Sequence, residues 1–120
     1  MEAINLKEKL SKFSDHWSPK TVGELNGQKV LLAKLKGEFV WHKHDNEDEL
    51  FQVIRGVLKI EFEDKTLTLQ PGEIVIIPKG TLHKPIAEEE VEVMLFEPIE
   101  TLNTGNAVDS GLTKTENPKI

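Results

Sequence analysis

Cysteine is absent from the 120 residues of this sequence, which excludes disulfide bonds, thiolate nucleophiles and thiolate metal ligands. Any bound metal ion must therefore be held by nitrogen and oxygen atoms. Arginine occurs once, as Arg55, and the formal net charge is -6 at pH 7. Because binding to a phosphate backbone needs clustered cations, we expect no nucleic-acid partner.

Long apolar runs are also missing from the sequence. No stretch is long enough to cross a membrane, and residues 1–10 lack the basic start and apolar core of a secretory signal. We therefore expect no membrane partner and a cytoplasmic location. The length is typical of one domain, so residues 1–120 are predicted to fold as a single unit.

Apolar and polar residues alternate through the middle of the sequence, as is typical of half-buried strands. Turn signals such as Asn26-Gly27 separate these runs, and this spacing favours an all-β sandwich or barrel. The acidic run at 88–90 indicates an exposed turn. The expected strands are residues 21–25, 29–36, 49–54, 58–63, 66–69, 73–77 and 91–96.

The two ends differ from this middle region. Residues 6–13 carry apolar side chains at helical spacing and predict a short N-terminal helix. The residues after Pro98 are small and polar and show no periodicity. The expected domain therefore has an N-terminal helix and loop at 1–20, a barrel at 21–98 and an extended C-terminal tail on the surface at 99–120.

Three histidines and one glutamate form a candidate metal site. His42 and His44 are two residues apart, and on a strand this spacing points both imidazoles to the same face. Glu49 begins the next apolar run, and His83 follows a turn at 78–80 that brings the chain back toward the same sheet. A lone His-x-His pair is usually a solvated strand face, so the prediction depends on all four residues. This donor set suits Mn, Fe, Co, Ni, Cu or Zn and leaves coordination positions open.

The same residues carry a resemblance to the cupin superfamily. The first cupin motif, G-x5-H-x-H-x3-4-E-x6-G, is similar to a set of residues in which the first glycine is one position closer to the first histidine. Those residues are Gly37, His42, His44, Glu49 and Gly56.

The second cupin motif, G-x5-P-x-G-x2-H-x3-N, resembles Gly72, Pro78, Gly80 and His83, with Ala87 in place of the terminal asparagine. The resemblance implies a small single-domain cupin of the conserved-barrel type. Its expected fold is a double-stranded β-helix, or jelly-roll, barrel. It also implies that the family's four metal-ligand positions are all filled.

Two apolar residues are predicted to line a substrate pocket. Phe51 and Val53 share the parity of Glu49 on the same expected strand, so their side chains should face the barrel interior. An ordinary role in the core is an equally good interpretation, because side chains fill most small barrels.

The resemblance does not select one activity, since cupins include isomerases, dioxygenases, decarboxylases, sugar-binding regulators and storage proteins. Our leading hypothesis is a metal-dependent enzyme, of dioxygenase or isomerase type, that acts on a small organic molecule. The alternative is a non-enzymatic module that binds a small molecule or a sugar. We name no catalytic residue. An apolar N-terminal segment and an open sheet edge favour a homodimer, and the resemblance to cupins implies the same arrangement.

Overall fold

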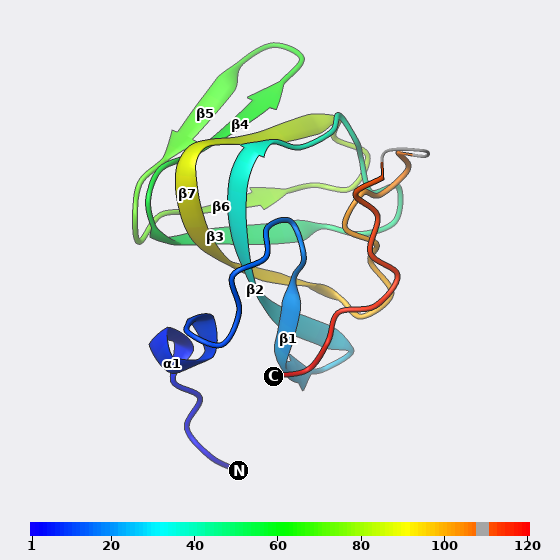
Figure 1. Ribbon diagram of the computed structural model, residues 1–120. Helices are drawn as coiled ribbons and strands as arrows, with labels where there is room; N and C mark the ends of the chain where they lie inside the picture. The colour runs from blue at the N-terminus through cyan, green and yellow to red at the C-terminus, as the bar shows by residue number, and fades with distance from the viewer. Residues whose placement is uncertain (108–110) are drawn as a thin grey trace.

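The computed structural model describes residues 1–107 and 111–120 (Figure 1). Residues 108–110 of the predicted tail lie outside this part. The described residues form the helix α1 (Leu6–Leu10) and the strands β1 (Lys20–Leu25), β2 (Gln28–Glu38), β3 (Glu49–Arg55), β4 (Leu58–Phe62), β5 (Thr66–Leu69), β6 (Ile74–Ile77) and β7 (His83–Pro98). All of these strands pair in antiparallel fashion, which confirms the predicted all-β class.

Strand β7 organises the sheet, because it pairs with β2, β3 and β4. Neighbouring strands follow the order β1-β2-β7-β3-β6, and β4 joins β7 to the β4–β5 hairpin. Figure 1 shows β7 curving strongly as it passes from the β4 side of the molecule to the β2 side. This curvature closes the sheet into a barrel.

The bend in β7 corrects one expectation. Residues 88–90 were predicted to form an exposed turn, but the strand continues through them with their side chains exposed. Between the pairs Leu35↔Val91 and Gly37↔Ala87, β7 has three residues where β2 has one. The acidic run is therefore a bulge, which lets a single strand change direction without ending.

The barrel interior follows the period-two pattern of the sequence. On β7, Val91, Val93 and Leu95 face inward, and Phe51 and Val53 do the same on β3. Each large aliphatic side chain that is fully buried contributes about 2 kcal/mol of transfer free energy. The core consists of Leu31, Ala33, Leu35, Phe51, Val53, Leu58, Ile60, Leu69, Ile77, Ala87, Val91, Val93 and Leu95.

The N-terminal helix is shorter than predicted. It starts after Asn5, whose side-chain oxygen accepts a hydrogen bond from the backbone N–H of Glu8 at 3.0 Å, and it ends at Leu10. Leu10 is its buried residue. In the described parts of the chain, no helix is long and apolar enough to cross a membrane.

The loop between α1 and β1 places an indole beside the barrel. Trp17 has a φ of 57°, which is rare for a residue with a Cβ. Its backbone N–H donates to Lys34 O at 2.9 Å, and its Nε1–H donates to Lys36 O at 2.9 Å. Its ring stacks on Phe39 with 4.6 Å between the centroids. These contacts fix Trp17 over the end of β2.

The C-terminal residues differ from the predicted surface tail. Thr101 and Thr104 are buried, so residues 99–107 belong to the packed structure. The buried ammonium of Lys29 explains this docking, because it donates to Thr101 O at 2.9 Å and to Asn117 Oδ1 at 2.8 Å. The chain then ends beside β1 (Figure 1), where the Ile120 N–H donates to a backbone carbonyl oxygen of that strand.

Two glycines with similar backbone angles allow a test of the packing around the bulge. Gly56 has a φ of 89°, and a Cβ added there would lie 2.8 Å from Glu90 O and 3.2 Å from the Val91 Cα. Gly72 has a φ of 86° and nothing within 4 Å of such a Cβ. We expect Gly56→Ala to lower the free energy of unfolding by about 3 kcal/mol and Gly72→Ala by about 1 kcal/mol. Urea unfolding of both variants measures the difference, and equal losses would contradict it.

Candidate metal centre

His42 and His44 lie in the segment between β2 and β3, outside both strands. The predicted strand is present only as a single bridge, in which His42 N–H donates to His83 O at 3.0 Å and His83 N–H donates to His42 O at 2.9 Å. The predicted consequence still holds, since alternate side chains of this extended segment point toward the same interior. The bridge also brings His83, at the start of β7, beside His42.

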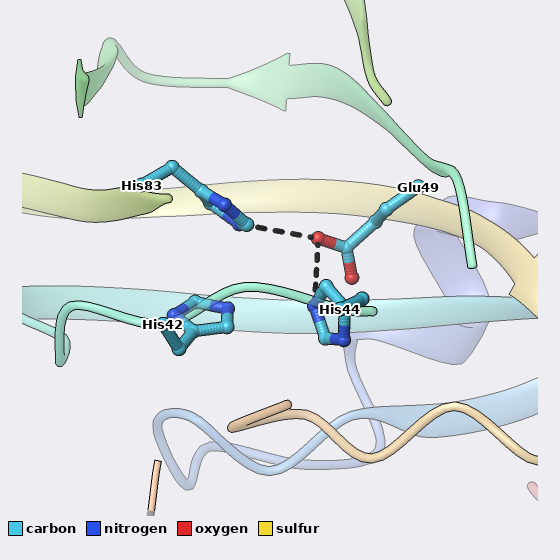
Figure 2. A group of neighbouring side chains, drawn as sticks. All are labelled: His42, His44, Glu49 and His83. Carbon is cyan, nitrogen blue, oxygen red and sulfur yellow. Dashed lines mark ion pairs between the residues drawn. The ribbon is translucent and has the colours of Figure 1, made fainter. Parts of the chain in front are cut away.

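The four predicted ligands converge inside the barrel. Figure 2 shows the carboxyl group of Glu49 beside the imidazoles of His44 and His83, with the imidazole of His42 below that of His83. One donor atom from each residue lies within 4.8 Å of the other three, and each residue is 4% exposed or less. Glu49 Oε1 is 3.5 Å from His44 Nε2 and 3.7 Å from His83 Nε2. These separations are too long for good hydrogen bonds but suit atoms that share one cation.

Backbone carbonyl groups orient two of the imidazoles. His42 Nδ1 lies 2.9 Å from Val40 O, and His83 Nδ1 lies 2.9 Å from Thr81 O. Each Nδ1 must therefore carry the proton, which leaves Nε2 with a free lone pair. This is the orienting contact that histidine ligands of metal ions usually make.

Several buried polar atoms of the cluster have no hydrogen-bond partner within the described residues. They are both ring nitrogens of His44, Oε1 of Glu49 and Nε2 of His83. Each such atom costs about 1–3 kcal/mol when it is left unsatisfied. A cation shared by Nε2 and Oε1 atoms would remove most of this cost, so the residues fit a metal ion that prefers nitrogen and oxygen ligands.

The electrostatics of the cluster favour the protonation state that metal binding requires. Burial, together with the nearby His83, lowers the pKa of His42 to about 4, so its imidazole is neutral at pH 7. Burial alone would raise the pKa of Glu49, but the adjacent imidazoles of His44 and His83 outweigh this effect and hold that pKa below its usual value. A neutral imidazole and a charged carboxylate are both competent ligands.

Glu97 is a further buried acid that the sequence analysis missed. It is 2% exposed, and its pair in the sheet is Lys29 of β2. The pair Leu50↔Phe96, extended by one residue, places Glu49 of β3 opposite Glu97 of β7. Parity was the available signal, because Glu97 continues the inward positions of the expected strand at 91–96 and is the first charged residue among them.

Burial raises the pKa of Glu97 well above its usual value, and the negative charge of Glu49 raises it further. Like charges directly across a sheet are destabilising, so the nearby carboxylate of Glu49 favours the protonated form of Glu97.

A narrow cavity of about 40 Å³ lies beside the candidate ligands. His42, Glu49 and Glu97 line it, and so does the predicted pocket residue Phe51. Val53 is 0% exposed and packs in the core away from this cavity. The other lining residues are Trp17, Pro19, Ala33, Leu35, Phe39, Pro85, Leu95 and Asn103.

The C-terminal segment closes the other side of the histidine pair. Asn106 N–H donates to Lys43 O at 3.0 Å, and Lys43 N–H donates to Asn106 Oδ1 at 2.8 Å. Gly105, with a φ of 53°, approaches so closely that a Cβ there would overlap Lys43 O and meet His44 Nδ1 at 3.1 Å. The segment that carries His44 is therefore held by a main-chain and a side-chain hydrogen bond from a distant part of the sequence.

A family model described as the cupin domain matches residues 30–98, a stretch that contains all four candidate ligands. This chain belongs to the cupin family. A cupin-2 domain containing protein from Shewanella frigidimarina is 49% identical to this cupin, with a TM-score of 0.78 over 79% of this chain and 93% of that one. These matches confirm the barrel that the two motifs predicted.

Two other relatives of this cupin support the assignment. A Neisseria meningitidis protein of known structure is 31% identical, with a TM-score of 0.75 over 81% of this chain and 99% of that one. The Bacillus subtilis protein YdbB is 42% identical over 83 residues, which are 68% of this chain and 67% of YdbB. The likeness therefore extends over most of the length of each protein.

The low pKa of His42 predicts a pH dependence of the metal-free protein. Between pH 6.5, the ordinary pKa of histidine, and about pH 4, His42 is protonated in the unfolded chain but stays neutral in the folded chain. The contribution of His42 to stability is thus present above pH 6.5 and is lost as the pH falls, by an amount on the order of 3 kcal/mol. In urea unfolding with EDTA, the free energy of unfolding of His42→Gln should fall less across this pH range than that of the wild type. Identical pH profiles would contradict the assignment.

Proposed function

We propose that this cupin binds one divalent transition-metal ion through His42, His44, Glu49 and His83. The observation that carries the proposal is the convergence of four buried donors whose inward-facing atoms are mostly without protein partners. Three imidazoles and one carboxylate fit Mn, Fe, Co, Ni, Cu or Zn, and an octahedral ion would keep coordination positions for a ligand.

We further propose that the protein is a metal-dependent enzyme, of dioxygenase or isomerase type, acting on a small organic molecule. A metal ion held by these four residues would supply Lewis-acid polarisation of a substrate oxygen. The stacked rings of Trp17 and Phe39 form an apolar part of the wall of the adjacent cavity. The carboxyl group of Glu97 lies at the wall of this cavity, where it is placed for general acid–base chemistry.

The second candidate function is a non-enzymatic module that binds a small molecule or a sugar. The small volume of the cavity favours it, because side chains such as Val53 occupy most of the barrel interior. For a sugar to bind, the site would have to extend beyond the cavity toward the surface. Homodimer formation and a cytoplasmic location stay predictions.

Substitution of a proposed ligand tests metal binding directly. We expect His42→Ala to weaken metal affinity by at least about tenfold, because a bound ion would lose one of its four protein donors. His16→Ala is the matched control, since His16 lies outside the cluster and pairs with Glu90 at 2.6 Å. Elemental analysis of both variants, purified without chelator, measures occupancy. Equal metal content in the two proteins would exclude the proposed ligand set.

Turnover separates the enzyme from the binding module. The protein loaded with each candidate metal would be incubated with enediols, oxalate, flavonols and sugar phosphates, and the products followed by mass spectrometry. We expect conversion of at least one class, with loss of conversion in His42→Ala, because an open coordination position can polarise a substrate oxygen. Binding of these compounds without conversion would favour the module.

A further inference from the structure

Glu97 lies at the cavity wall, and one of its carboxyl oxygens has no protein partner. Glu97 Oε2 is buried and makes no hydrogen bond to the described residues. Glu97 itself is 2% exposed and lines the cavity together with His42 and Glu49. A buried oxygen in this position costs free energy unless some molecule donates a hydrogen bond to it.

The contacts between Glu97 and its cross-strand neighbour do not explain why this position carries a carboxyl group. Lys29, the cross-strand neighbour of Glu97, directs its ammonium to Thr101 O and Asn117 Oδ1. No ion pair within 4.0 Å joins Lys29 to Glu97, both of which the structure describes. An apolar residue would continue the inward row of β7 at lower cost, as Leu95 does two positions earlier. The hydrogen-bonding capacity of this Glu97 oxygen is therefore left unsatisfied by the described residues.

We propose that Glu97 accepts a hydrogen bond from a hydroxyl group of the ligand that occupies the cavity, while an oxygen of the same ligand coordinates the metal. This inference rests on the proposed metal site and names its ligand class as small hydroxylated molecules. A water molecule needs roughly 10–15 Å³ of cavity space, so a cavity of about 40 Å³ admits a chain of about three non-hydrogen atoms. The part of the ligand beyond the metal is accordingly short.

A hydroxyl group fits this subsite better than an amine. Most of the remaining lining is apolar, including Leu35, Phe51 and Leu95, and a buried ammonium would need more compensation than one carboxyl oxygen offers. A hydroxyl donates one hydrogen bond and brings no charge. The acceptor role does not depend on the protonation state of Glu97, because a carboxyl group keeps an acceptor oxygen in either state.

Three matched compounds test the proposal on the full-length protein loaded with Co²⁺. Propanoate, 3-hydroxypropanoate and 3-aminopropanoate share a carboxylate that can coordinate cobalt, and they differ only in the terminal group. Changes in the visible absorption of cobalt report binding without any need for turnover. We expect the wild type to bind 3-hydroxypropanoate about tenfold more tightly than propanoate, as one buried hydrogen bond to a carboxyl group allows.

Substitution of Glu97 supplies the decisive comparison. Glu97→Leu should remove the preference for 3-hydroxypropanoate while leaving the cobalt content unchanged, and Glu97→Gln should keep part of it because the amide retains a carbonyl acceptor. Glu92→Leu is the control, since Glu92 lies on β7 with the opposite parity and near Lys34. Thermal unfolding checks that each variant folds, and the comparison of compounds on the wild type stands even if Glu97→Leu does not.

The possible failures are distinguishable. If cobalt does not bind before any compound is added, the proposed function is wrong, and this inference is wrong with it. If cobalt binds, the inference alone is overturned by equal affinities for propanoate and 3-hydroxypropanoate, by tighter binding of 3-aminopropanoate, or by a hydroxyl preference that persists in Glu97→Leu. If none of the compounds binds, the inference is also overturned, because no hydroxylated ligand then donates a hydrogen bond to Glu97.

Discussion

The reciprocal backbone hydrogen bonds between His42 and His83 are the contact on which the candidate site depends. They join two distant parts of the chain as an isolated bridge outside the regular strand pairs. They also place the two imidazoles 4.3 Å apart, measured between ring centroids. Main-chain bonds are a robust way to achieve this, because they fix the segments independently of the side chains. The imidazoles are then free to turn their Nε2 atoms inward.

The sequence predicted the part of the site that depends on local spacing and parity. His42 and His44 diverge from a regular strand, yet their alternation survives, and Glu49 and His83 each begin a strand. Glu97 was missed because a single acid at the end of an apolar strand is usually an exposed terminus. Only the pairing of β7 with β2 and β3 reveals that this position is interior.

The C-terminal residues show a second limit of sequence reasoning. Small polar residues without periodicity are typical of a loose tail, but Thr101 and Thr104 are buried. Their placement depends on the ammonium of Lys29, whose hydrogen bonds to Thr101 and Asn117 span most of the chain. A polar contact of such long range leaves no periodic trace in the sequence.

The bulge at residues 88–90 also determines where this strand can change in length. Its three side chains are exposed, and its three residues lie opposite a single residue of β2. An insertion or deletion there therefore changes only the length of the bulge. A one-residue deletion between Val91 and Glu97 would instead rotate all following side chains to the opposite face. Leu95 and Glu97 would then leave the interior together, so hydrophobic packing and the acidic wall of the cavity could not be lost separately.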